Sequence, residues 1–126
     1  MRVLIADDQK DVGISLAQLV YCCNHQVVRV VGSGLEAIRA YTRYRPDVVL
    51  MDCRMPKLNG PTACRNILAK DPAARVILVS GWSPSIEAET SGAIAILAKP
   101  VRLERLEAAL HTVAQTLPVD QEATTS

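Results

Sequence analysis

Five short apolar runs alternate along the chain with segments in which apolar residues recur at helical spacing. The runs consist mostly of Val, Ile, Leu and Ala with little polar alternation, which is typical of parallel strands covered on both faces. They cover residues 3–6, 27–31, 48–51, 76–79 and 93–98. Because parallel neighbours need a crossover of a dozen or more residues, the pattern predicts a parallel sheet with a helix after each strand.

The segments between the runs carry helix signals of unequal strength. Ser33 and Glu36 form a capping box, and Pro61 fits the first position of a helix. Apolar stripes at helical spacing indicate further helices near residues 12–23 and 103–117. The segment after the fourth strand is the weakest, because Ile86 is its only large apolar residue before Gly92. We therefore predict a doubly wound α/β sandwich with helices on both faces of the sheet.

Length, charge and cysteine spacing narrow the classes of protein to consider. The chain has 126 residues, enough for one domain with a core, and its net charge of +1 gives no electrostatic case for nucleic-acid or membrane binding. No apolar run approaches the length of a membrane span and no signal peptide opens the chain, so we expect a cytoplasmic location. None of the cysteines has C-x-x-C spacing, so we expect reduced thiols.

Charged and hydroxyl side chains stand at the ends of four predicted strands. Asp7 and Asp8 follow the first strand, Asp52 the third, Ser80 the fourth and Lys99 the fifth. Carboxyl ends of parallel strands meet at one edge of the sheet, where such folds bind ligands. Three neighbouring carboxylates repel one another without a cation, so this pattern predicts a hard divalent ion, Mg²⁺ or Mn²⁺. A carboxylate beside a lysine also suits phosphoryl transfer, because the carboxylate can form an acyl phosphate.

Each of these residues also has an ordinary interpretation when it is considered alone. Asp52 could be a turn residue, and Asp7 or Asp8 could cap the first helix. Lys99 could be a surface lysine, and a small residue such as Ser80 is common after a strand. Only the presence of all five at one predicted edge favours a functional site.

Four segments, "LIADDQ", "VVLMDCRMPKLNG", "VILVSG" and "LAKP", occur in this order and resemble receiver domains of two-component response regulators. Asp52, Met55, Pro56 and Gly60 carry the most specific of these motifs. The resemblance runs from Arg2 to about Leu117. It implies a flavodoxin-like (βα)5 fold with strand order 2-1-3-4-5 and a receiver domain over 1–117. Residues 118–126 are polar and poor in apolar side chains, so we expect a disordered tail or a truncated linker there.

The resemblance also implies a role for each matching residue. Asp52 would accept a phosphoryl group from a phosphohistidine on a sensor histidine kinase or a histidine phosphotransfer protein. Asp7, Asp8, Asp52 and the backbone carbonyl of Arg54 would hold Mg²⁺, while Ser80 and Lys99 would contact the phosphoryl group. The bond between Lys99 and Pro100 is cis in such domains. The chain would catalyse only its own phosphorylation and dephosphorylation, and would not act as an enzyme on a free substrate.

The sequence departs from the receiver pattern around its fifth strand. Ile96 stands where receivers carry Tyr or Phe, and the interval from Ser80 to Lys99 is short by about one helical turn. We hypothesise that the apolar residues here, with Pro100, form a partner or homodimer surface; the equal alternative is that Ile94 and Ile96 are core. Arg54 and Trp82 follow the site residues by two positions and could slow hydrolysis, or could be exposed loop residues without such a role.

We consider three other functions on the basis of the residues alone. A haloacid dehalogenase-type phosphatase needs an Asp where this chain has Arg54, and the chain has no room for a cap domain. A flavodoxin-like cofactor carrier needs a hydroxyl- and glycine-rich phosphate loop where this chain reads "ADDQKD". A degenerate receiver could act as an unphosphorylated scaffold, which the missing aromatic at Ile96 keeps open. The output partner or domain is not identified by any motif.

Overall fold

One parallel sheet organises the chain in the computed structural model, which describes residues 1–81 and 85–118. Within these residues the strand order is β2-β1-β3-β4-β5, as the receiver resemblance implies. The strands are β1 Arg2–Ala6, β2 Gln26–Val31, β3 Val48–Asp52, β4 Val76–Ser80 and β5 Ala95–Ala98. The helices are α1 Lys10–Cys22, α2 Gly34–Tyr44, α3 Gly60–Lys70, α4 Ile86–Glu89 and α5 Leu103–Thr116.

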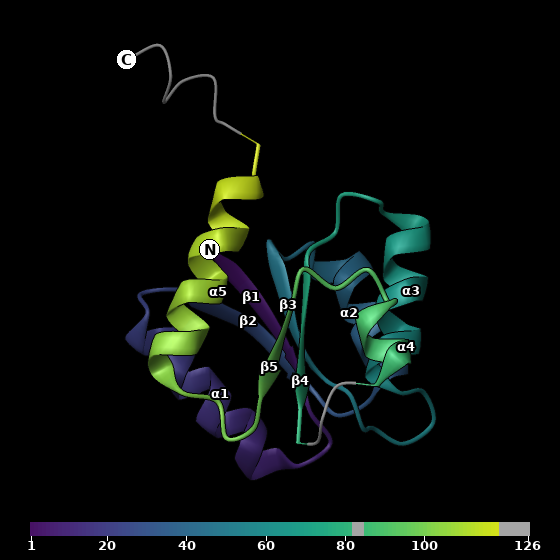
Figure 1. The fold of residues 1–126 in the computed structure, drawn as a ribbon, viewed down its shortest axis with the longest axis horizontal. Coiled ribbons are helices and arrows are strands. Elements are labelled where there is room, and N and C mark those ends of the chain that lie inside the picture. The colour runs from purple at the N-terminus through teal and green to yellow at the C-terminus, as the bar shows by residue number, and fades with distance from the viewer. Residues whose placement is uncertain (82–84, 119–126) are drawn as a thin grey trace.

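Helices cover both faces of the sheet (Figure 1), so the predicted sandwich is confirmed. α1 and α5 lie against one face, and α2, α3 and α4 lie against the other. Each face has its own apolar core. Leu50 and Leu106 belong to the core beneath α1 and α5, whereas Met51 and Ile67 belong to the core beneath the other helices. Neighbouring residues of one strand therefore anchor opposite layers, because side chains alternate across a sheet.

The central strands are more deeply buried than the edge strands. Every residue of β3 and β4 is buried, as are Val3–Ala6 of β1. β2 and β5 form the two edges and are only partly covered. The continuous apolar runs of the sequence thus mark the strands that are covered on both faces, as expected for a parallel sheet.

Local hydrogen bonds explain where α2 and α3 begin. The Ser33 side chain accepts the Glu36 backbone N–H, which confirms this half of the predicted capping box. The Glu36 carboxylate reaches back to the N–H of Gly32, one residue before the expected partner. α3 begins at Gly60, so Pro61 is its second residue and not its first, and the preceding Asn59 side chain caps the helix by accepting the Thr62 N–H.

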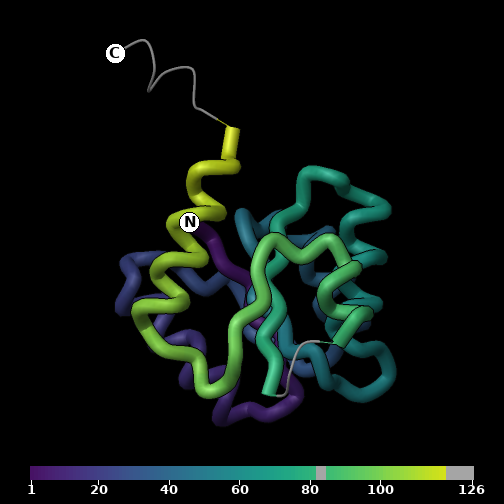
Figure 2. The backbone as a smooth tube through the Cα atoms, in the orientation of Figure 1, coloured from purple at the N-terminus to yellow at the C-terminus, as the bar shows by residue number. Residues whose placement is uncertain are grey.

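The connection between β4 and β5 (Figure 2) contains α4, the shortest helix in the part of the chain that the structure describes. α4 has only four residues, and its N-cap is Ser85, whose side chain accepts the Ala88 N–H. The helix start predicted at Ser83 and Pro84 lies outside the described residues. β5 begins at Ala95, two residues later than the predicted strand. Gly92 precedes it with a φ of +90°, a conformation that costs glycine little.

The last helix ends near the residue predicted for the end of the domain. α5 runs to Thr116 and its C-cap is Leu117. Most of the predicted tail, residues 119–126, lies outside the described residues. In the part of the chain that the structure describes, no helix is long and apolar enough to cross a membrane.

Candidate functional site

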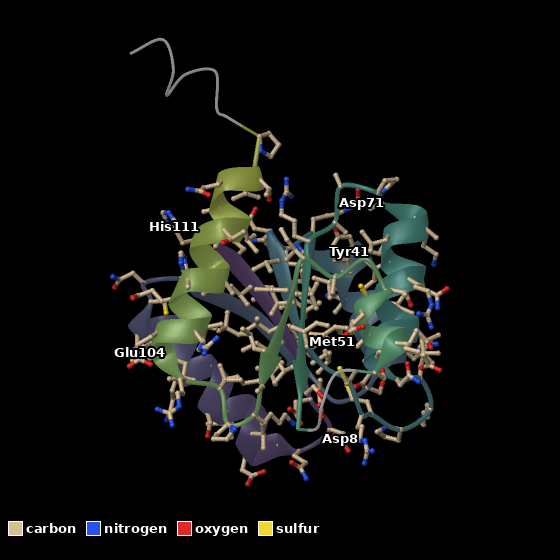
Figure 3. The ribbon with its side chains drawn as sticks, in the orientation of Figure 1. Asp8, Tyr41, Met51, Asp71, Glu104 and His111 are labelled. Atoms are coloured by element: carbon tan, nitrogen blue, oxygen red, sulfur yellow. The ribbon has the colours of Figure 1, made fainter. Side chains whose placement is uncertain are left out.

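The carboxyl ends of four strands bring the predicted site residues to one edge of the sheet. Asp7 directly follows β1, Asp52 and Ser80 are the last residues of β3 and β4, and Lys99 directly follows β5. Figure 3 shows Asp8 at this edge, far from the end of the sheet that carries Tyr41 and Asp71. Asp7, Asp52 and Ser80 are buried, whereas Asp8 is exposed. The buried strands thus fix three of these side chains and leave Asp8 facing solvent.

The Lys99 ammonium lies between two of the carboxylates. Its Nζ atom is 3.2 Å from Asp7 Oδ2 and 3.3 Å from Asp52 Oδ1. The Asp7 side chain is fully buried, and its other oxygen accepts the backbone N–H of Gln9 at 2.9 Å. Asp7 therefore binds the start of the first crossover without capping α1: the N-cap is Gln9, which has no side-chain cap bond. The capping role considered for Asp7 or Asp8 is wrong.

Burial and neighbouring charges perturb the ionisation of this cluster. Burial and the nearby Asp7 carboxylate raise the pKa of Asp52, while Lys99 and the Arg54 backbone N–H oppose that rise. Burial alone would lower the pKa of Lys99, but the Asp52 and Asp7 carboxylates outweigh it and raise that pKa. The ammonium is therefore held charged, and one positive charge faces three acidic side chains.

The acidic side chains have the composition of a hard-cation site. One carboxylate oxygen from each of Asp7, Asp8 and Asp52 lies within 4.8 Å of the other two. Carboxylate and backbone carbonyl oxygens are the ligands that Mg²⁺ takes in proteins, usually with several waters. A cavity of about 250 Å³ beside them is lined by Asp8, Gln9, Asp52, Arg54, Gly81 and Lys99. The residues present therefore fit a divalent cation together with a small anionic group.

Two glycines let the loop after β3 pack closely against its surroundings. A Cβ atom on Gly60 would lie 2.2 Å from the Asp52 carbonyl oxygen, and one on Gly34 would lie 2.3 Å from the Leu58 carbonyl oxygen. Both contacts are with backbone atoms, which cannot move aside like a flexible side chain. The Gly60 of the sequence motif is thus needed because α3 begins against the backbone of Asp52.

Cys53 and Asn59 contribute to the site region without having been singled out from the sequence. Burial raises the pKa of the Cys53 thiol, and the Ser80 hydroxyl opposes that rise, so Ser80 lies close to the thiol. Both line a second cavity of about 580 Å³ between the β3–α3 loop and the start of α4. Asn59 could have been recognised as a cap, because Asn commonly precedes a helix that has Pro in its first turn.

The residues that were assigned a role outside this cluster from the sequence differ in their exposure and lie in different parts of the fold. Arg54 is exposed beside the cavity, and Trp82 lies outside the described residues. Ile94 and Ile96 are partly buried and pack against opposite cores of the sheet, whereas Pro100 is exposed. The two isoleucines therefore do not form one continuous exposed face, and a partner surface at β5 stays a prediction. The bond between Lys99 and Pro100 is cis.

Comparisons with known proteins agree with this geometry. The family model described as the response regulator receiver domain matches residues 3–111. The chain is 32% identical over 118 residues to the chemotaxis protein CheY of Listeria monocytogenes, covering 91% of this chain and 99% of that one. It is 33% identical over 117 residues to CheY of Thermotoga maritima, covering 90% and 98% of the two chains.

Solved structures give the same result. The CheY of the CheX–CheY–BeF3–Mg complex from Borrelia burgdorferi superposes with a TM-score of 0.84 at 27% identity, covering 90% of this chain and 89% of that one. The response regulator domain of CheB from Thermotoga maritima superposes with a TM-score of 0.76 at 33% identity, covering 95% and 98%. Neither the phosphatase nor the flavin carrier considered from the sequence is supported. The chain belongs to the response regulator receiver domain family, of the CheY-like two-component type.

Proposed function

We propose that this chain is a phosphoacceptor switch in which Asp52 receives a phosphoryl group in a Mg²⁺-dependent reaction. One observation carries the proposal: Lys99 Nζ bridges Asp7 and Asp52 at the edge where three carboxylates converge within 4.8 Å. Phosphoryl transfer needs positioning and charge neutralisation more than covalent chemistry by many groups. A rigidly placed carboxylate beside one fixed ammonium meets that need.

Asp52 would act as the nucleophile. Its carboxylate oxygen attacks the phosphorus of the donor, the donor's bond to phosphorus breaks, and the donor leaves with that electron pair. Because the side chain ends a fully buried strand, its direction is set by the sheet and not by a mobile loop. Lys99 would then exchange its contact with Asp52 for one with a phosphoryl oxygen, and the Ser80 hydroxyl would donate to another.

Receiver domains bind Mg²⁺ at an acidic pocket, and this chain has such a cluster. Asp7, Asp8, Asp52 and the Arg54 carbonyl would hold the ion. When bound, Mg²⁺ supplies positive charge that offsets the mutual repulsion of the carboxylates and of the incoming phosphoryl oxygens. The chain's own part is to keep Asp7 buried and oriented by the Gln9 N–H, and to leave Asp8 open to solvent.

The donor would be a phosphohistidine on a sensor histidine kinase or a histidine phosphotransfer protein, which would make the chain a signalling switch and not an enzyme with a free substrate. The Borrelia burgdorferi relative is in a complex with CheX, so a domain of this fold binds protein partners there. We further propose that the exposed Arg54 side chain hinders the water that hydrolyses phospho-Asp52. An Arg54→Ala variant would then lose its phosphoryl group several-fold faster than wild type in a timed decay assay.

Intact mass after incubation with acetyl phosphate tests the acceptor. With Mg²⁺ the wild-type protein should gain one phosphoryl group, and Asp52→Asn should gain none. Asp47→Asn is the matched control, because Asp47 lies at the other end of β3 and binds the Arg2 backbone N–H. An adduct that persists in Asp52→Asn would move the acceptor to another residue. No adduct in wild type with Mg²⁺ would favour the unphosphorylated scaffold.

A further inference from the structure

The outer edge of β2 has a basic surface on one face of the sheet and an apolar surface on the other. The proposed phosphorylation site uses neither surface. β2 pairs only with β1 among the described strands, so its other side has no strand partner. We propose that this edge binds an extended segment of a partner protein in which acidic and apolar residues alternate. β2 and β5 are opposite edges of the sheet, and the inference does not depend on the proposed phosphorylation.

The basic surface lies between β2 and α2. Arg29 from β2 and Arg39 and Arg43 from α2 are exposed around one hollow of about 200 Å³. The part of the chain that the structure describes offers none of them an ion-pair partner, although the Arg43 guanidinium lies 5.6 Å from the centre of the Tyr44 ring. Guanidinium groups bind carboxylates through paired N–H donors, so this hollow suits acidic side chains.

The apolar surface lies on the opposite face of the same edge. Val30 of β2 is 40% exposed, and its Cγ1 atom would lie 3.0 Å from a Cβ atom on Gly13, so Val30 lies beneath α1. Ile14 and Tyr21 are 50% and 58% exposed and lie two turns apart on one side of α1. Leu19 and Cys23 pack into the core on a different side of the helix. Ile14 and Tyr21 therefore lie on an exposed side of α1, the helix that partly covers Val30.

The backbone of β2 supplies the connection between these two surfaces. The Val31 carbonyl accepts the N–H of Asp7, so Val31 bonds inward to the β1 side. Successive residues of a strand in a parallel ladder direct their backbone groups to opposite sides, so the N–H and carbonyl of Val30 point to the open edge. A segment added there would place alternate side chains on opposite faces. One set would meet the arginines, and the other would meet Val30, Ile14 and Tyr21.

The chemistry of the hollow favours such a peptide over a nucleic acid. Its lining also includes the apolar and aromatic side chains of Val31, Ala40 and Tyr44. A nucleic acid would leave the exposed apolar side chains of α1 and Val30 without a partner, whereas the apolar residues of an alternating peptide would cover them. A charged residue on an edge strand can also serve only to prevent aggregation. That explanation accounts for Arg29 but not for the two unpaired arginines on α2.

Titration with three synthetic peptides, followed by two-dimensional 15N NMR of the whole chain, tests the proposal. The capped heptapeptide Glu-Val-Glu-Val-Glu-Val-Glu should shift amide signals of β2 and α2 and slow hydrogen exchange of the Val30 amide. Glu-Glu-Glu-Val-Val-Val-Glu has the same composition without alternation and should bind at least tenfold more weakly. Lys-Val-Lys-Val-Lys-Val-Lys should not bind. Equal binding of the first two peptides, or no binding of the first, would overturn the proposal.

A charge reversal provides the matched variants. Arg29→Glu combined with Arg39→Glu should lose the acidic peptide and bind the lysine peptide instead. Lys70→Glu combined with Arg105→Glu changes net charge equally at exposed positions outside the hollow, and should keep the wild-type preference. Tighter binding of an eight-residue oligothymidine than of the alternating acidic peptide would show a nucleic-acid surface and also overturn the proposal. The peptide series uses the unaltered protein, so a variant that fails to fold cannot obscure the answer.

Discussion

The two halves of the sheet differ in how deeply their strands are buried and in the length of the helices beside them. Every residue of β3 is buried, and α2 and α3 beside it have eleven residues each, with side-chain caps at Ser33 and Asn59. In the other half, β5 is partly exposed and α4 has four residues. Asp52 belongs to the first half, whereas α4 and β5 belong to the second. The strand that positions the proposed acceptor is therefore fully buried under long helices, and β5 in the other half is partly exposed beside a short one.

This difference has a physical consequence for dynamics. Regions with few buried contacts and short helices open at lower free energy than the core does. A residue that must be placed accurately is held best on fully packed strands. A segment that changes conformation must instead have a low free energy of opening. We therefore expect the α4–β5 segment to be the most readily opened of the described elements, and we expect matched substitutions in the two halves to differ in their effect.

Truncating one core residue in each half should give the largest contrast. Leu50 of β3 is fully buried, so Leu50→Ala should lower the free energy of unfolding by about 4 kcal/mol. Ile96 of β5 is partly buried, so Ile96→Ala should cost about 2 kcal/mol, because less apolar surface is lost. Urea denaturation measures both. Equal losses would mean that the β5 half is as tightly packed as the centre.

Two glycines offer the next comparison. Gly60→Ala forces a Cβ atom against the backbone of Asp52 and should cost about 3 kcal/mol. Gly92→Ala meets the end of the Leu68 side chain and a φ of +90°, so it should cost about 1.5 kcal/mol because the side chain can shift. Thermal unfolding compares them. Gly60→Ala should also slow phosphoryl uptake from acetyl phosphate, whereas Gly92→Ala should leave that rate close to wild type.

The hydrogen bond from Tyr41 to Asp71 links α2 to the end of α3 at 2.6 Å. Tyr41→Phe should cost about 1.5 kcal/mol at pH 7, since the acceptor is charged. This bond is the main cause that lowers the pKa of Asp71 below 3.8, while burial raises the pKa of Tyr41 to about 12 and keeps its hydroxyl protonated.

The pH dependence of that loss has a defined sign. A carboxyl whose pKa is depressed in the folded state stabilises the fold above its unfolded pKa, and this contribution is lost as the pH falls through the folded value. The difference in stability between wild type and Tyr41→Phe should therefore be constant near neutrality and shrink below about pH 4. Denaturant titrations at several pH values measure it. A difference that grows on acidification would contradict the assignment.

The smallest expected effect concerns the cap of α4. Ser85→Ala removes the side-chain acceptor for the Ala88 N–H, worth about 1 kcal/mol to the local structure. Hydrogen exchange of residues 86–89 should accelerate about fivefold while global unfolding changes little, because α4 can open alone. Asn59→Ala is the control on α3, where the same loss should appear in global stability. A global loss in both variants would show that α4 unfolds only with the whole domain.

The sequence predicted the fold and the site cluster well, for reasons visible in particular residues. Buried parallel strands leave continuous apolar runs, so β1, β3 and β4 could be located within a residue or two. Asp7, Asp8, Asp52 and Lys99 could be brought together because strand ends of one polarity must share an edge. Weaker elements were placed less well. β5 was predicted to start at Ala93, and small partly buried residues give no pattern that marks its start at Ala95.

What the sequence determined by itself is the succession of strands and helices along the chain and the residue types at the strand ends, because periodicity and residue type act locally. The shared edge of the charged residues followed from the common polarity of parallel strands. Tertiary structure alone decided that Lys99 bridges Asp7 and Asp52, that Gly60 packs against the Asp52 backbone, and that Ile94 and Ile96 pack on opposite cores. It also placed three arginines and an apolar flank on the two faces of β2. Such contacts join residues far apart in the chain, and their distances depend on how the helices pack on the sheet.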